Sequence, residues 1–120
     1  MHSERLLEHF KNPRNVGQLP PPAITIDAAN PACGDMMRLS ARFEDGRVRE
    51  VRYQVRGCTA SIAAGSALTA WMEGKTPDEL RALVPSVIEH NLDGLEPASK
   101  HAAVLCVDAV KRLVELAKAG

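Results

Sequence analysis

The chain has 120 residues, of which 45% are hydrophobic and 3% aromatic, so its core must be built mainly from aliphatic side chains. Fifteen basic residues balance fifteen acidic ones, and this zero net charge argues against a nucleic-acid partner and against attraction to an anionic membrane. We find no bilayer-spanning apolar run and no layout of a secretory signal. Three cysteines, an odd number, therefore predict reduced thiols in a cytoplasmic protein.

The N-terminal part predicts a helix, a loop and a strand. Ser3 can cap a short helix, which must end near Pro13 because the residue before a proline disfavours the helical conformation. The apolar face of this helix carries Leu6, Leu7 and Phe10. Residues 17–22 include three consecutive prolines and form a connection, and residues 23–29 predict a first strand.

The central part predicts a β-hairpin. Residues 36–44 and 47–56 alternate apolar and polar side chains, as half-buried strands do. Asp45-Gly46 between them is a strong turn signal. The step from Val48 to Val51 breaks the alternation, which predicts a bulge.

Beyond the hairpin the pattern becomes helical. Residues 59–73 are rich in alanine and end before Gly74, which suits a helix terminus. Thr76 and Glu79 form a capping box with a proline between them, so another helix starts there.

The C-terminal part predicts two further helical segments. Pro85 interrupts the preceding helix, and Ser86 can cap another turn or two. Ser99 can cap a long last helix. The apolar stripe of that helix comprises Ala102, Leu105, Cys106, Ala109, Leu113 and Leu116. The whole pattern predicts one α+β domain over residues 1–120, with a small three-stranded antiparallel sheet and helices packed on one of its faces.

Four residues are candidates for a functional site. Cys33 and Asp35 lie on a predicted loop, and Cys58 opens a helix, where the positive helix end favours a thiolate. His101 lies near the start of the last helix. Each also has an ordinary interpretation. A loop cysteine can be buried, an aspartate can cap a turn, a cysteine that opens a helix can serve packing alone, and a helical histidine can be exposed without a function.

Taken together, these donor types favour a metal site. Thiolate, carboxylate and imidazole are zinc ligands, and sulfur-rich sites also suit iron–sulfur clusters, although the long spacing here is not that of a zinc finger. We expect Cys106 to be a core residue, because it lies in the middle of an apolar stripe. We expect His9 and His90 to lie at the surface of amphipathic helices.

Several segments resemble the IscU/NifU-type scaffold proteins of iron–sulfur cluster assembly, and the resemblance covers nearly the whole chain. The matching segments are residues 8–17 (EHFKNPRNVG), 31–35 (PACGD), 57–63 (GCTASIA), 71–75 (WMEGK) and 101–109. The NPRNVG and CGD blocks in this order are specific in combination.

The resemblance implies both a fold and a function. It implies an α+β sandwich with a three-stranded antiparallel sheet, and a transient [2Fe–2S] cluster built on three cysteines with an aspartate and a histidine nearby. It further implies that sulfur comes from a cysteine desulfurase, that the cluster passes to recipient apo-proteins, and that isolated members hold zinc at the same residues. The residues of this chain at those positions are Cys33, Asp35, Cys58 and His101.

The chain departs from the family pattern at two places. Ala102 stands where the family has a third cysteine, the one usually implicated as sulfur acceptor. Cys106 is the nearest thiol, but it lies one helical turn or ~6 Å further on, too far for a side-chain rotation to replace the lost ligand. Residues 95–99 keep one proline and lose the lysine of the segment that engages a dedicated chaperone, which argues against such a partner.

Two functions follow. The first is a scaffold-like protein that binds iron, zinc or a [2Fe–2S] cluster with Cys33, Asp35, Cys58 and His101 and accepts sulfur from a desulfurase. The alternative is a non-catalytic adaptor or regulatory module, zinc-bound or metal-free, that binds a desulfurase or another assembly partner. Neither is an enzyme, because the sequence offers no nucleophile–base pair with an orienting third group.

Overall fold

The computed structural model describes residues 2–31 and 34–119. The elements follow one another along the chain as α1 (Glu4–Lys11), β1 (Ile24–Ala29), β2 (Met36–Glu44), β3 (Arg47–Arg56), α2 (Thr59–Met72), α3 (Pro77–Arg81), α4 (Pro85–Asn91), a 3₁₀ turn (Pro97–Ser99) and α5 (His101–Ala119). The two strands of the hairpin begin and end where the sequence predicts, and β1 begins one residue later than predicted.

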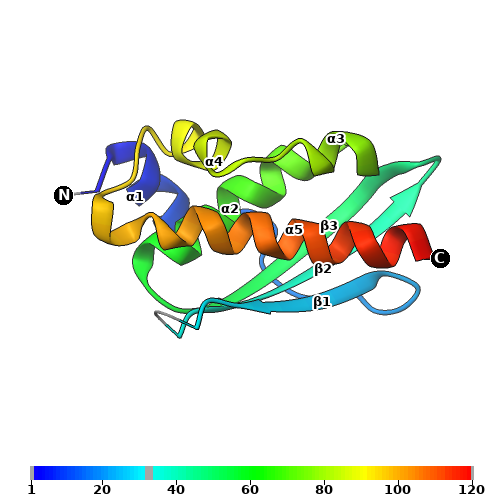
Figure 1. The fold of residues 1–120 in the computed structure, drawn as a ribbon. Helices are drawn as coiled ribbons and strands as arrows, with labels where there is room; N and C mark the ends of the chain where they lie inside the picture. The colour runs from blue at the N-terminus through cyan, green and yellow to red at the C-terminus, as the bar shows by residue number, and fades with distance from the viewer. Residues whose placement is uncertain (1, 32–33, 120) are drawn as a thin grey trace.

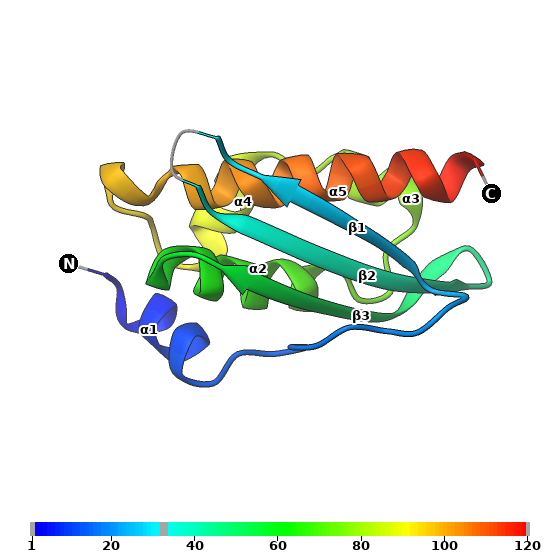
Figure 2. The same ribbon diagram turned by 90° about the horizontal axis from the view of Figure 1, so that it is seen from below.

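The strands form a three-stranded antiparallel sheet in the order β1-β2-β3. Helices α2 and α5 lie across one face of this sheet, and α3 and α4 lie beyond them (Figure 1). The opposite face carries no helix or strand of the described chain, as the view from below shows (Figure 2). The predicted α+β class, with helices on one face of a small sheet, is therefore confirmed.

The hairpin between β2 and β3 has the predicted turn and the predicted bulge. Asp45 and Gly46 both have positive φ, 54° and 76°, as a tight two-residue turn requires. Arg42 pairs with Glu50 and Phe43 with Val48, so Arg49 is the extra residue of the bulge. The bulge restores the inward direction of Val48, which is buried together with Val51 and Tyr53 of the same strand.

The outer edge of β3 is covered by the segment that follows α1. Val16 forms a parallel bridge with Tyr53, whose N–H donates to the carbonyl of Asn15 (2.8 Å) and whose carbonyl accepts from the N–H of Gly17 (2.9 Å). This cover removes one of the two free sheet edges and ties the segment around Asn15 to the sheet.

Helix α2 packs very closely on β3. A Cβ at Gly65 would lie 2.3 Å and 2.4 Å from two carbons of the Tyr53 ring, so only glycine allows this contact. The Tyr53 hydroxyl donates to the carbonyl of Ile62 (2.7 Å), and burial raises the pKa of this hydroxyl to about 12. These contacts fix the position of α2 over the sheet, and with it the position of Cys58 at the start of α2.

Three local expectations are corrected. Helix α4 begins at Pro85 itself with Val84 as its N-cap, so Ser86 does not cap it. Ser99 lies inside the 3₁₀ turn, and Lys100 directly precedes α5. Leu116 continues the apolar stripe but is half exposed, and it lines a surface pocket beside Thr25 and Ile26 of β1.

Among the described residues, we find no helix that combines the length and the apolar character needed to cross a bilayer.

Candidate metal centre

Asp35 ends a tight loop just before β2. The N–H of Asn30 donates to the carbonyl of Asp35 (2.9 Å), and the N–H of Gly34 donates to the carbonyl of Asn30 (2.8 Å). Gly34 has a φ of 77°, a conformation that glycine adopts without strain. The loop places the Asp35 carboxylate in a buried position at one end of the sheet, where only 7% of the residue is exposed.

Cys58 and His101 reach the same end of the sheet from two helices. Cys58 is the N-cap of α2 with extended backbone, and its side chain makes no capping hydrogen bond. Its thiol is therefore free to point away from the helix, and it is exposed. His101 is the first residue of α5, and its imidazole is half-buried.

The structure brings Asp35, Cys58 and His101 together. The Cys58 Sγ lies 3.5 Å from Asp35 Oδ2 and 3.7 Å from His101 Nε2, and His101 Nε2 lies 3.2 Å from the same Oδ2. The sequence separates these residues by 23, 43 and 66 positions. Cys33, the fourth predicted site residue, lies outside the described residues.

The Asp35 carboxylate is held in its charged form. Burial by itself would raise its pKa, but hydrogen bonds from Ser61, Cys58 and His101 outweigh burial, so the pKa lies below its usual value. Ser61 makes the shortest of these contacts, 2.5 Å from its Oγ to Oδ2. A carboxylate that stays charged while it is buried is ready to bind a cation.

The distances between the three donor atoms fit a tetrahedral ion. With zinc bonds of about 2.3 Å to sulfur and about 2.0–2.2 Å to nitrogen and oxygen, neighbouring ligand atoms are about 3.4–3.6 Å apart. The observed separations of 3.2, 3.5 and 3.7 Å lie close to these values before any ion binds. All three donor atoms lie within 4.8 Å of one another, and this is the one such group that we find in the described part of the chain. A tetrahedral ion takes four ligands, and the described residues supply three of them.

The same three residues do not form a catalytic triad. In a triad the base contacts the nucleophile through one ring nitrogen and the orienting carboxylate through the other. Here the same Nε2 of His101 faces both Cys58 and Asp35. The arrangement suits three ligands that converge on one ion.

The other thiol of the described chain, Cys106, lies apart from this group. It has no exposed surface, and burial raises the pKa of its thiol. Ala102, which follows His101 in the chain, is also fully buried, and its methyl side chain has no donor atom. The prediction that Cys106 is a core residue is confirmed.

One histidine prediction is wrong. His9 is buried, and its Nδ1 lies 2.8 Å from the Ser66 Oγ on α2. The same hydroxyl accepts from the backbone N–H of Arg14 (2.9 Å). His9 therefore ties α1 and the turn after it to α2, a role that local periodicity could not reveal. His90 is exposed, as expected.

Sequence reasoning also missed two residues that contact the carboxylate. Ser61 donates to Asp35, and a Cβ at Gly57 would lie 2.6–2.9 Å from the carboxyl atoms of Asp35. Local pattern gives no signal for either contact, because Asp35 is 26 residues away from Ser61 in the chain.

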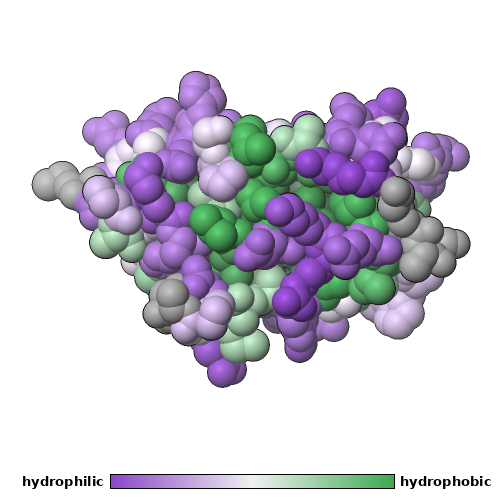
Figure 3. All heavy atoms as spheres, viewed as in Figure 1, coloured by the Kyte–Doolittle hydropathy of each residue, from purple (hydrophilic) through white to green (hydrophobic). Residues whose placement is uncertain are grey.

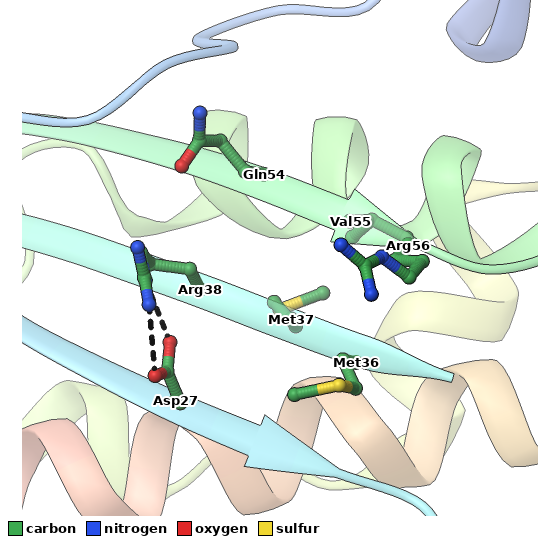
Figure 4. Close-up of a pocket in the computed structure, with 7 residues that line it drawn as sticks. All are labelled: Asp27, Met36, Met37, Arg38, Gln54, Val55 and Arg56. Carbon is green, nitrogen blue, oxygen red and sulfur yellow. Dashed lines mark hydrogen bonds and ion pairs between the residues drawn. The ribbon is translucent and has the colours of Figure 1, made fainter. Parts of the chain in front are cut away.

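A pocket of about 360 Å³ lies on the open face of the sheet (Figure 4). Asp27 and Arg38 form a bidentate ion pair along this pocket, with nitrogen–oxygen distances of 2.8 Å and 3.1 Å. Met36 and Arg56 line the end of the pocket that lies nearest to Asp35. It contains neither a thiol nor an imidazole, so it lacks the donors of a soft-metal site.

The helical face carries polar side chains with apolar ones between them (Figure 3). Two exposed apolar residues belong to the helices: Val84 is the N-cap of α4, and Val104 lies one turn after His101 on α5. Scattered apolar side chains of this kind are common on protein surfaces.

Comparison with known proteins identifies the family. The family model described as the NifU-like N terminal domain matches residues 1–118. The chain is 37% identical over 117 residues to the iron–sulfur cluster assembly scaffold protein IscU of Azotobacter vinelandii, covering 94% of this chain and 91% of the relative. It is 33% identical over 114 residues to the scaffold protein IscU 1 of Archaeoglobus fulgidus, covering 95% of this chain and 74% of the relative. Its fold matches the N-terminal part of a NifU-like protein from Brucella abortus with a TM-score of 0.74 at 24% identity, covering 94% of this chain and 93% of the other.

Proposed function

Because the chain belongs to the family of NifU-like N-terminal domains, we propose that it is a scaffold-like protein of iron–sulfur cluster assembly. In this proposal iron and sulfide are cargo, which the chain holds and then passes to recipient apo-proteins. Cys33, Asp35, Cys58 and His101 are the proposed ligands. The chain binds its cargo without turning over a substrate, and so it acts as a scaffold and not as an enzyme.

The observation that carries the proposal is the convergence of three donor atoms at one end of the sheet. Asp35, Cys58 and His101 supply an oxygen, a sulfur and a nitrogen within 4.8 Å of one another. The carboxylate is buried, the imidazole half-buried and the thiol exposed, so the group opens outward. An outward-facing thiol suits a protein that must receive its cargo from one partner and give it to another.

We further propose that the exposed Cys58 takes up sulfur from the persulfide of a cysteine desulfurase. The Cys58 thiolate would attack the outer sulfur of that persulfide. The sulfur–sulfur bond to the desulfurase cysteine breaks, that cysteine leaves as a thiolate, and the outer sulfur stays on Cys58. The hydroxyl of Ser61 and the imidazole of His101, 3.5 Å and 3.7 Å from Sγ, are placed to hydrogen-bond the sulfur.

A second candidate function is an adaptor that holds one zinc or iron ion and binds a desulfurase or another assembly partner. One observation favours it: Ala102 is fully buried and offers no donor, so the site has one thiolate fewer than a three-cysteine scaffold. The three converging donors of the described residues suit a single ion, whereas a two-iron cluster takes four protein ligands and would need Cys33 as well.

Anaerobic reconstitution with ferrous iron and sulfide tests the proposal. We expect visible absorbance of an iron–sulfur cluster, with iron and sulfide found by chemical analysis. Cys58→Ala should lose most of the cluster and most of the bound zinc or iron, because it removes the exposed thiolate. Cys106→Ala is the matched control and should keep the wild-type metal content, since Cys106 is buried in the core.

The outcomes separate the two functions. Bound metal without cluster absorbance supports the single-ion adaptor and overturns the scaffold. Equal metal content in wild type and Cys58→Ala overturns the site itself. Transfer of radiolabelled sulfur from a desulfurase to wild type but not to Cys58→Ala supports Cys58 as the acceptor, and unchanged transfer contradicts that role.

A further inference from the structure

Ser61 is a buried serine whose hydroxyl points at the metal-site carboxylate. It lies in the first turn of α2, three residues after the N-cap Cys58, and it has no exposed surface. Its Oγ is 2.5 Å from Asp35 Oδ2 and 3.5 Å from the Cys58 sulfur. The hydroxyl of Ser61 therefore contacts two of the three donor residues.

The oxygen that Ser61 holds is the one that faces the other donors. Asp35 Oδ2 lies 3.2 Å from His101 Nε2 and 3.5 Å from the Cys58 sulfur. The backbone at Gly57 also lies against this carboxylate, since a Cβ there would lie 2.6 Å from its carboxyl carbon. The carboxylate thus contacts both a hydroxyl and a stretch of backbone, and its Oδ2 faces the other donors.

The Ser61 hydroxyl is directed at the site and not at its own helix backbone. Within the described residues, its hydrogen-bond partners are Asp35 and Cys58. Ser66 is five residues further on the same helix and equally buried, but its hydroxyl hydrogen-bonds His9 and the backbone N–H of Arg14. These hydrogen bonds tie α1 to α2. The two serines are alike in burial and helix, but only Ser61 contacts the candidate ligands.

We propose that Ser61 is a positioning residue that fixes Asp35 Oδ2 on the bound metal and so slows the loss of that metal to competing acceptors. The inference rests on the proposed metal-holding function and adds a residue that acts through Asp35. Ligating carboxylates are oriented by hydrogen bonds from their neighbours, and loss of such a partner typically lowers metal affinity about 10–100-fold. When Cys58 and His101 bind the ion, their side-chain hydrogen bonds to Asp35 are lost, and the carboxylate keeps the hydroxyl of Ser61 and the backbone hydrogen bond from Cys58. Loss of the Ser61 hydroxyl therefore leaves the carboxylate less firmly oriented.

Cobalt(II) is the probe, because its bond to a thiolate gives an absorption band that reports on Cys58. We expect Ser61→Ala to bind Co²⁺ about 10–100-fold more weakly than wild type and to release it faster to a chelator. Ser61→Thr, which keeps the hydroxyl, should restore most of the affinity. Ser66→Ala is the matched control: it should lower thermal stability but leave the Co²⁺ affinity within about twofold of wild type.

A second variant tests the same point without removing the hydroxyl. Gly57→Ala places a methyl group on the Asp35 carboxylate and should displace it, so Co²⁺ affinity should fall as in Ser61→Ala. Its circular dichroism spectrum at the assay temperature checks that it is folded.

The possible results are distinct. If wild type binds Co²⁺ through Cys58 but Ser61→Ala binds it equally well, Ser61 has no positioning role and the metal site stands. If Ser66→Ala loses as much affinity as Ser61→Ala, the effect is one of general stability and the inference is overturned. If wild type itself binds no Co²⁺, the proposed metal-holding function fails and the role of Ser61 fails with it.

Discussion

Cys58 and Cys106 are both free cysteines, but they differ in their exposure to solvent. Cys58 is exposed at a helix start, whereas Cys106 is fully buried in α5 and burial raises the pKa of its thiol. A thiol must be accessible and ionised to react. We therefore expect iodoacetamide to modify Cys58 of the metal-free, folded protein quickly and Cys106 only when the protein unfolds. Mass mapping of the labelled peptides measures both rates in one sample.

The variant Cys106→Ala completes this test. It should cost about 1 kcal/mol of stability, at the low end for a small core truncation. Chemical denaturation measures this cost. Rapid labelling of Cys106 in the folded wild type would show that α5 opens enough to bring this thiol toward the site.

At the scale of elements, the contact between α2 and β3 depends on one glycine. In an ordinary helix, Gly→Ala stabilises by about 0.5–1 kcal/mol. At Gly65 the new Cβ would lie 2.3 Å from the Tyr53 ring, so we expect Gly65→Ala to destabilise instead, by about 1–3 kcal/mol from overpacking. Urea unfolding measures the sign directly.

A control on the same helix separates packing from propensity. Ala70 is exposed on α2, and Ala70→Gly should cost about 1 kcal/mol through helix propensity alone. If Gly65→Ala stabilises the protein while Ala70→Gly behaves as expected, α2 does not approach β3 as closely as described.

At the scale of the whole molecule, His9 links α1 to the rest of the fold and makes stability depend on pH. Burial, with a smaller effect from the charge of Arg14, lowers the pKa of His9 below its ordinary value of 6.5. The unfolded chain therefore takes up a proton at this residue at a higher pH than the folded chain does. Stability from His9 is complete above about pH 6.5 and is lost as the pH falls below it.

We expect the free energy of unfolding of the metal-free protein to fall between pH 7 and pH 5, with a slope from His9 of at most about 1.4 kcal/mol per pH unit. Urea unfolding in the presence of a chelator, repeated at each pH, measures this slope. His9→Gln should flatten the profile, whereas His90→Gln, at an exposed position, should not. A wild-type profile that is flat over this range would contradict the buried, neutral His9.

The local sequence determined the elements of this protein. Alternation in residues 36–44 and 47–56, the Asp45-Gly46 turn and the capping box at Thr76 act over a few residues, and the structure reproduces each of them. The sequence also determined which types of metal-binding side chain are present, because a thiol, a carboxylate and an imidazole are all typical zinc ligands. The spacing of these residues along the chain does not show that they belong to one site, and the resemblance to the family implied that they do.

Only the tertiary structure decided which side chains meet. Periodicity tells which face of a helix is buried, but it does not tell what lies against that face. His9 therefore was expected at the surface and lies against Ser66, 57 residues away. Ser61 and Gly57 gave no local signal, because their role comes from Asp35, which the hairpin brings back beside the start of α2. The geometry of the candidate metal site is set by long-range packing, which a pattern of neighbouring residues does not encode.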